Sequence, residues 1–214
     1  MPFVFCWIAL MPLPVDAAPL SAEISNADTT VFVALGANLP GPFGGPAESL
    51  RHAMERLREM PDGVLHGGTL YSTPAYPAGN GPDYVNAVLA VRASDTVRFV
   101  ANAFGIESEF NRDKDRAAGR WAPRAIDIDI VAIGGQILPD PARHAALRAK
   151  APIDRVLTDE GLVVPHPAMQ ERAFVLKPMA FFAPSWRHPA LDRTALELAE
   201  ALPAEELDAV RAIT

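Results

Sequence analysis

Short segments of apolar or alternating residues recur along the chain and predict the strands of a sheet. Val85, Ala87, Leu89 and Val91 would share one face of an extended segment, with the intervening residues on the other face. The remaining segments are apolar or alternating runs bounded by Gly and Pro, which is typical of strands that end in turns. Strands are therefore predicted over 31–35, 64–73, 84–91 and 126–133.

A helical period replaces the alternation between some of these segments. Leu50, Ala53, Met54 and Leu57 fall at positions i, i+3, i+4 and i+7. This spacing places them on one side of an amphipathic helix, which is predicted over about 46–60.

The resulting order of elements is strand, helix, strand, strand, helix, strand. Ser94 is the expected N-cap of the second helix, which would run to about Asn111. A βαββαβ order is typical of a ferredoxin-like α+β fold, in which both helices cover one face of an antiparallel sheet. The other face would then be free to carry polar side chains. The segment 192–214 predicts extra C-terminal helices, short and split by Pro203.

Composition narrows the class of protein. Half of the 214 residues are hydrophobic and 21% are charged, as in ordinary globular domains. A formal net charge of -7 argues against a nucleic-acid binder that relies on bulk positive charge. The single cysteine excludes an internal disulfide framework and a cysteine-based zinc site. We expect a cytoplasmic monomer with neither nucleic acid nor membrane as a partner.

Residues 1–28 differ from the rest of the chain. An apolar stretch followed by small residues resembles part of a signal peptide, but no Lys or Arg precedes it. The stretch is also too short and too interrupted by proline to span a bilayer. We interpret it as an extension, disordered or ahead of the true start site; a weak secretory signal and a surface anchor are the alternatives. One domain is expected over 29–214, with an insertion near 139–160.

The strand over 126–133 carries the strongest chemical signal. Asp127 and Asp129 alternate with isoleucines, so both carboxylates would project from the same face. Adjacent carboxylates repel each other unless a cation lies between them, and their hard oxygens suit Mg²⁺. Arg120 and Arg124 lie just upstream, and guanidinium groups beside a magnesium site favour a polyphosphate ligand. The same pattern also fits a surface strand whose solvated carboxylates pair with a basic loop.

Two further features suggest a second ligand. Tyr84 and Asn86 would lie side by side on the strand over 84–91, where a ring could stack on a planar heterocycle and an amide could read its edge. The alternative is that Tyr84 is simply exposed at an edge and that the Asn86 amide makes its hydrogen bonds within the fold. Glu107 lies near the end of its helix, where the helix dipole disfavours a carboxylate. It would contact either the region of Arg112 or a bound nucleotide.

Taken together, these motifs resemble the family of 6-hydroxymethyl-7,8-dihydropterin pyrophosphokinases over residues 31 to about 189. The combination of an RWxPRxxDxD block with a later PHP and RxFVL block is specific to that family. The matching segments are ALGANL at 34–39, YSTP at 71–74, PDYVN at 82–86, RWAPRAIDIDI at 120–130, VPHP at 164–167 and RAFVL at 172–176.

The resemblance implies transfer of a pyrophosphoryl group from ATP to the hydroxymethyl oxygen of the dihydropterin, with AMP as the second product. It implies two Mg²⁺ ions held by Asp127 and Asp129. The catalytic cations implied are Arg112, Arg120 and Arg124. The pterin contacts implied are Thr73, Pro74, Tyr84, Asn86 and Phe174. The ATP contacts implied are Glu107, Lys114, Trp121, Ile130, His166 and Arg172.

The chain departs from the family pattern at a few positions. Ala122 stands where the family usually has glycine, and Gly161 and Val163 stand where a basic residue and a threonine are common. The insertion near 139–160 is expected to be a solvated loop. Two non-enzymatic hypotheses remain at this point. One is a ferredoxin-like module that binds nucleotide or RNA without catalysis, and the other is a catalytically inactive relative.

Overall fold

The computed structural model describes residues 19–60, 63, 65–75, 81–110, 124–151 and 161–213. Its strands are β1 (Thr30–Ala37), β2 (Leu65–Gly67), β3 (Tyr71–Thr73), β4 (Tyr84–Arg92), β5 (Asp127–Ile133), β6 (Arg187–His188), β7 (Arg193–Thr194) and β8 (Arg211–Ala212). Its helices are α1 (Ala22–Ser25), α2 (Pro46–Arg58), α3 (Thr96–Glu109), α5 (Pro141–Ala149), the 3-10 turn η2 (Met169–Glu171), α6 (Ala173–Phe182), α7 (Ala195–Glu200) and α8 (Ala204–Ala209).

The main sheet is antiparallel and has the order β5-β1-β4-β3-β8, with β2 also paired to β4. This confirms the predicted α+β class and antiparallel sheet. The strand predicted over 64–73 is divided into β2 and β3. Gly67 ends β2 and Gly68 follows it, with φ angles of 83° and 92°, which are left-handed values that favour glycine. After the division, β2 pairs with the end of β4 at Leu89–Val91, and β3 pairs with the end that carries Tyr84 and Asn86.

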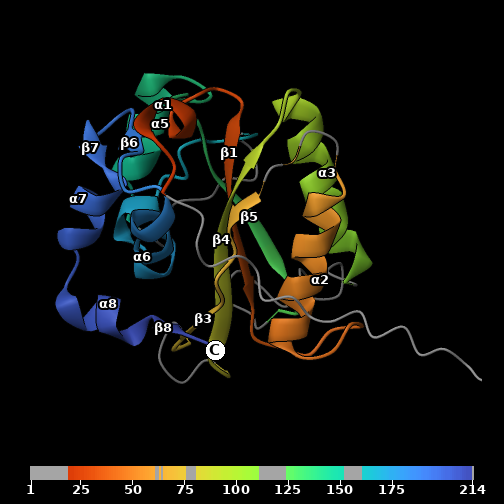
Figure 1. Ribbon diagram of the computed structural model, residues 1–214. Helices are drawn as coiled ribbons and strands as arrows, with labels where there is room; N and C mark the ends of the chain where they lie inside the picture. The colour runs from red at the N-terminus through yellow and green to blue at the C-terminus, as the bar shows by residue number, and fades with distance from the viewer. Residues whose placement is uncertain are drawn as a thin grey trace, which may run out of the picture.

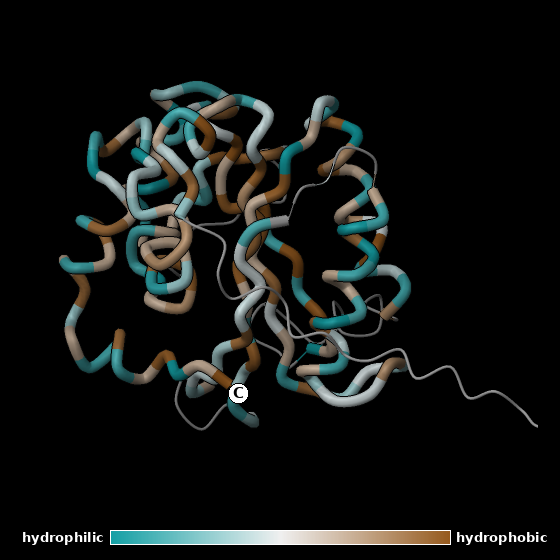
Figure 2. Tube along the Cα trace, in the orientation of Figure 1, coloured by the Kyte–Doolittle hydropathy of each residue, from teal (hydrophilic) through white to brown (hydrophobic). Residues whose placement is uncertain are grey.

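The two helices of the predicted βαββαβ pattern share one face of the sheet, as expected, but the other face, which was expected to be free, is largely covered by further helices. Helices α2 and α3 pack on the first face, and α6 and α7 lie against the second (Figure 1). Hydrophobic residues are concentrated along the strands between the two helical layers (Figure 2). The run over 173–182 is apolar nearly all round, with Pro178 inside it, so its pattern did not identify α6.

The predicted alternation of β4 is confirmed. Ala87, Leu89 and Val91 belong to the first core, while Val88 and Ala90 belong to the second. Two local expectations were wrong. Asp95, not Ser94, caps α3, because its carboxylate accepts a hydrogen bond from the Arg98 N–H at 2.9 Å.

The second wrong expectation concerns the insertion near 139–160, part of which is the helix α5. Asp140 caps this helix, and Pro141 occupies its first turn. His144 and Leu147 on its inner face are buried. The helix is therefore packed against the rest of the fold and is not a solvated loop.

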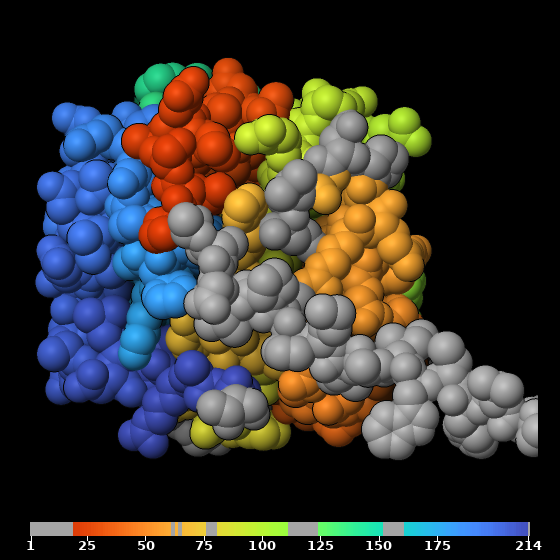
Figure 3. Space-filling model, in the orientation of Figure 1, coloured from red at the N-terminus to blue at the C-terminus, as the bar shows by residue number. Residues whose placement is uncertain are grey.

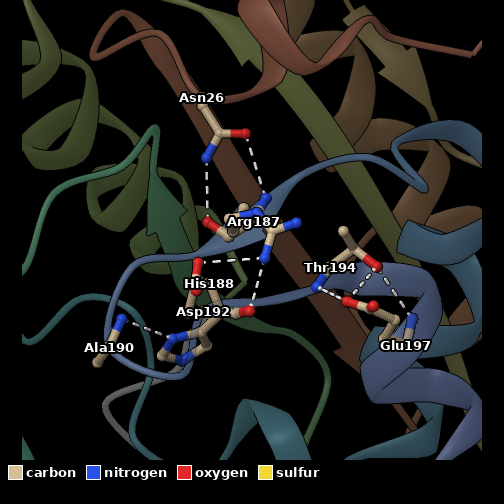
Figure 4. Close-up of polar contacts among 7 residues, drawn as sticks. All are labelled: Asn26, Arg187, His188, Ala190, Asp192, Thr194 and Glu197. Carbon is tan, nitrogen blue, oxygen red and sulfur yellow. Dashed lines mark hydrogen bonds and ion pairs between the residues drawn. The ribbon is translucent and has the colours of Figure 1, made fainter.

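The packed part of the chain begins before residue 29. Leu20 is buried in the second core, and its N–H donates to the Phe182 carbonyl at 2.7 Å. The side-chain amide of Asn26 exchanges two hydrogen bonds with the backbone of Arg187 in the β6–β7 hairpin (Figure 4). Among the described residues, no helix combines the length and the apolar character that a membrane span requires.

Candidate active site

Near one end of the strands, a line of mostly polar residues crosses the second face of the sheet. We call it the polar row, and it runs through Asp127, Gly36, Asn86 and Tyr71. Gly36 of β1 lies between Asn86 of β4 and Asp127 of β5, and Asn86 in turn lies opposite Tyr71 of β3. A Cβ atom on Gly36 would lie 3.1 Å from the Asn86 side-chain oxygen. The missing side chain at Gly36 therefore leaves open the space between the metal-ligand candidates and the proposed pterin contacts.

Each of the two carboxylates on β5 is paired with its own arginine. One arginine lies three residues before its aspartate, and the other comes from the segment before α6. Arg124 Nη1 lies 2.9 Å from Asp127 Oδ1. Arg172 Nη1 lies 3.1 Å from Asp129 Oδ2. The side chains of Asp127 and Asp129 remain 26% and 37% exposed, so a ligand from solvent can reach them.

These charges set the protonation states in the site. Burial alone would raise the pKa of Asp129, but the charges of His166 and Arg172 outweigh it and hold the pKa below its usual value. Burial alone would lower the pKa of Arg124, but the Asp127 carboxylate outweighs it and raises that pKa. The Asp129 carboxylate and the Arg124 guanidinium are therefore charged at neutral pH. Burial raises the pKa of the Tyr84 phenol, against the opposing charge of Arg124.

The proposed pterin contacts lie on the β3 and β4 side of the row. Asn86 is 4% exposed, and its Nδ2 donates to the Thr73 hydroxyl at 2.8 Å. This bond fixes the orientation of the amide. Tyr84 is half-buried two residues before Asn86 on β4, opposite Thr73. Pro74 follows β3 on the surface.

Phe174 comes from the first turn of α6 and is half-buried. The guanidinium carbon of Arg172 lies 5.7 Å from the centre of its ring, which is within the range of a cation–π contact. Arg172 thus contacts both the Asp129 carboxylate and the ring expected to stack on the pterin. It links the proposed metal and pterin sides of the site.

Three expected ATP contacts lie around the outer edge of β5. Glu107 is 3% exposed, and its Oε1 accepts a hydrogen bond from the Ile128 N–H at 2.8 Å. The His166 N–H donates to the carbonyl of Val131 at 2.7 Å. The side chain of Ile130 is buried in the first core, so any contact that this residue makes with a nucleotide would be through its backbone.

Asn38 is a functional candidate that the sequence analysis used as part of a motif but did not assign to the site. Its Oδ1 accepts from the Arg124 N–H at 2.8 Å, and its Nδ2 donates to the Pro82 carbonyl at 3.1 Å. Its own N–H donates to the Arg124 carbonyl at 3.0 Å. Asn38 therefore joins the backbone of a proposed catalytic arginine to the segment before Tyr84. Its position just after a predicted strand was the available signal.

The carboxylates suit Mg²⁺ in type and placement. No group of three or more His, Cys, Asp or Glu side chains able to hold a metal occurs in the described part of the chain. Mg²⁺ usually keeps several waters and binds through one or two carboxylates plus substrate phosphates, so Asp127 and Asp129 satisfy its requirement without a third protein ligand. The expected contacts Arg112, Lys114, Arg120 and Trp121 lie outside the described residues.

The carboxylates of β5 and their paired arginines can take up metal and phosphate groups, and they lie beside a buried amide–hydroxyl pair and an aromatic ring that suit a planar ligand. The family model for 7,8-dihydro-6-hydroxymethylpterin-pyrophosphokinase (HPPK) matches residues 32–184. The chain therefore belongs to the HPPK family.

Individual relatives agree with this assignment. The chain is 35% identical over 181 residues to the 2-amino-4-hydroxy-6-hydroxymethyldihydropteridine pyrophosphokinase of Pseudomonas aeruginosa, covering 83% of this chain and 94% of that protein. It is 31% identical over 158 residues to the protein of the same name from Methylorubrum extorquens, covering 73% of this chain and 84% of that one.

A solved structure shares the fold. The crystal structure of wild-type Plasmodium falciparum HPPK-DHPS matches with a TM-score of 0.53 and 14% identity, over 80% of this chain and 44% of that chain. This chain thus spans less than half of the Plasmodium chain. At this identity the likeness concerns the fold alone.

Proposed function

We propose that the polar row on the second face binds ATP and the dihydropterin side by side, with Asp127 and Asp129 as ligands of two Mg²⁺ ions. As a member of the HPPK family, the chain is a pyrophosphokinase of folate biosynthesis, which transfers a pyrophosphoryl group from ATP to 6-hydroxymethyl-7,8-dihydropterin. The observation that carries the residue assignment is the pairing of two carboxylates on β5 with two arginines, beside the fixed Asn86 amide.

Bound Mg²⁺ would neutralise charge on the ATP phosphates, which is the main chemical requirement of phosphoryl-type transfer. The residues of the chain supply positioning and further charge. In the absence of ATP, Arg124 and Arg172 compensate the carboxylates. With ATP bound, their guanidinium forks would turn to phosphate oxygens, as bidentate donors suit. Arg112 and Arg120 are proposed to act with them.

The pterin would lie between the rings of Tyr84 and Phe174, with its edge read by Asn86, Thr73 and the backbone near Pro74. Because the Asn86 Nδ2 already donates to Thr73, its Oδ1 is the atom that faces the open space over Gly36. An amide oxygen accepts hydrogen bonds, so it suits the N–H groups of a pterin edge. ATP would lie along the β5 edge, near Glu107, Ile130, His166 and Arg172, with Lys114 and Trp121 as further contacts.

The test is formation of AMP from ATP by the purified chain, followed by chromatography. We expect AMP without ADP, and product only when ATP, Mg²⁺ and 6-hydroxymethyl-7,8-dihydropterin are all present. Omitting each component in turn, and replacing Mg²⁺ with a chelator, are the controls. ADP as the nucleotide product would contradict pyrophosphoryl transfer. Unchanged turnover with chelator would contradict the magnesium assignment.

A matched pair of variants tests the pterin side. Tyr84→Phe keeps the ring and removes the hydroxyl, whereas Tyr84→Ala removes the ring. Stacking on a planar ring is worth roughly 1–3 kcal/mol, so Tyr84→Ala should weaken pterin binding by about 10- to 100-fold. Tyr84→Phe should stay close to the unaltered protein in calorimetric titration of 6-hydroxymethylpterin with a non-hydrolysable ATP analogue. Equal losses in the two variants would contradict the stacking role.

A further inference from the structure

The C-terminal segment 204–213, here called the C-terminal clasp, completes the outer edge of the strand that carries Thr73. In the β8 pairing, Tyr71 lies opposite Ala212 and Ser72 opposite Arg211. The Ile213 N–H adds a hydrogen bond to the Leu70 carbonyl at 2.9 Å. Figures 1 and 3 show this segment, in dark blue, reaching the yellow strand β3 from the helical layer of α6 and α7.

Strand β3 is short, so its position depends on both neighbours. It pairs with β4 on one edge and with β8 on the other. A strand of three residues held on one edge alone has few hydrogen bonds to fix it. Thr73 is the last residue of β3, and its hydroxyl orients the Asn86 amide. A shift of β3 would therefore move both side chains expected to read the pterin edge.

The clasp also supports the first turn of α6. Tyr71 of β3, Ala173 of α6 and Val210 of the clasp form one buried cluster, and Phe174 packs against it. Val210 is 3% exposed, although α8 itself contributes no buried residue. The cluster thus joins the strand of Thr73 to the ring of Phe174. Thr73 and Phe174 are far apart in the sequence. The clasp contacts both of the segments that carry them, β3 and the start of α6.

Lys177 of α6 fixes the clasp at the point where it turns from α8 into β8. Its Nζ donates to the carbonyl of Leu207 at 2.8 Å and to the carbonyl of Val210 at 2.7 Å. Both carbonyls are at the C-terminal end of α8, where the helix dipole favours a cation, and the Leu207 carbonyl also accepts the Val210 N–H at 3.2 Å. A charged donor to two carbonyls is a strong link for a segment with so little apolar burial.

We propose that the C-terminal clasp is a positioning element for the pterin pocket and that Lys177 is the positioning residue that holds it. This inference rests on the proposed function, because it concerns the same pocket. The clasp contacts neither carboxylate of β5 in the pairings described, and Arg172 at the start of α6 is held separately by its ion pair with Asp129, so the effect should fall on the pterin side. Weakening the clasp should raise KM for the dihydropterin and leave KM for ATP unchanged.

Two variants weaken the clasp at different points. Lys177→Met keeps the aliphatic stem and removes both hydrogen bonds to the carbonyls. Ile213→Pro removes the N–H that donates to Leu70, and Ile213→Ala is its matched control because it keeps that N–H. Each protein is assayed for AMP formation at a temperature where circular dichroism shows it to be fully folded, with each substrate varied in turn.

The expected result is a rise of about 10-fold in KM for the dihydropterin in Lys177→Met and Ile213→Pro, which corresponds to loss of one ordinary interaction. KM for ATP should stay within about 2-fold, and Ile213→Ala should match the unaltered protein. Folded variants with an unchanged KM for the dihydropterin would overturn the proposal, as would equal rises for both substrates. If the unaltered protein forms no AMP, the proposed function itself fails, and that outcome is distinct from equal KM values among active proteins.

Discussion

The second face of the sheet has two halves that use the same strands for opposite purposes. In the half under α6, Phe32, Ala34 and Val88 are buried with the helix residues of the second core. In the other half, Gly36 and Asn86 continue the same side of β1 and β4, beside the carboxylates of β5. The strand geometry is common to both halves. What differs is the partner, since one half meets an apolar helix and the other is reached by solvent.

A bulge in β5 lies on the side of the apolar half, just beyond the two carboxylates. Phe32 lies opposite Ala132 and Val33 opposite Ile130, so Val131 has no partner in the register. Its carbonyl accepts the His166 N–H. Bulges change the direction in which later side chains point, and here both Val131 and Ala132 contact the second core. The bulge thus gives the second face two successive apolar residues of β5, Val131 and Ala132, beyond the carboxylates.

The largest effect is expected in the apolar half. Phe32 is fully buried, and its ring centre lies 5.7 Å from that of Trp186. Phe32→Ala should lower the free energy of unfolding by about 3–5 kcal/mol, because it removes buried area and leaves a cavity. Chemical denaturation measures this change. Turnover of the folded variant at low temperature should stay within about 2-fold, and a loss below about 1 kcal/mol would contradict the comparison.

The polar half should show the reverse behaviour. Asp127→Asn and Asp129→Asn should each lower kcat by about 10²–10³-fold, equivalent to roughly 3–4 kcal/mol in the barrier. Stability should change by at most about 1 kcal/mol, since each removes one partly exposed ion pair. Glu55→Gln on the exposed side of α2 removes a carboxylate elsewhere and is the control. Near-normal turnover of the two β5 variants would contradict the assignment of Asp127 and Asp129 as Mg²⁺ ligands.

The apolar half should also confer pH dependence on stability through His188. This side chain is fully buried, and burial, followed by the nearby His144 and Arg148, lowers its pKa to about 4. The unfolded chain binds a proton near pH 6.5, whereas the folded chain does not until about pH 4. The unfolding free energy should therefore fall as pH drops through this window, by about 2–3 kcal/mol from this group.

Denaturation of His188→Asn between pH 7 and pH 4 checks the sign and the source of this dependence. Asparagine retains an acceptor for the Ala190 N–H, which now donates to His188 Nδ1 at 3.1 Å (Figure 4). The variant should lose less stability on acidification than the unaltered protein. Identical pH slopes in the two proteins would show that other groups cause the effect.

The smallest effect is expected from one methyl group at the boundary. Gly36→Ala places a Cβ 3.1 Å from Asn86 Oδ1, so the amide must move by a few tenths of an ångström. We expect a rise of about 5- to 10-fold in KM for the dihydropterin, or roughly 1 kcal/mol. Gly105→Ala is the contrasting change, because nothing lies within 4 Å of the added atom on α3. It should stabilise the helix by about 0.5–1 kcal/mol and leave KM unchanged.

Much of the fold was predictable because its strands follow a strict alternation. The sides of β4, and of β5 as far as Ile130, were read correctly, since successive strand residues point to opposite faces; the bulge at Val131 was not predicted. The short C-terminal helices, divided at Pro203, were also confirmed. Helix α6 of the second helical layer was missed because its apolar run has no polar side that would identify it as a helix.

The sequence by itself determined the order along the chain of the strands and helices from β1 to β5, the shared face of Asp127 and Asp129, and the family to which the chain belongs. These properties follow from local periodicity and from residue types at fixed spacing. Tertiary structure alone decided that Asp129 meets Arg172, that Asn38 holds Arg124, and that the C-terminal clasp completes the strand of Thr73. Each of these contacts joins segments far apart in the chain, and such pairings depend on how the layers pack, which no local pattern encodes.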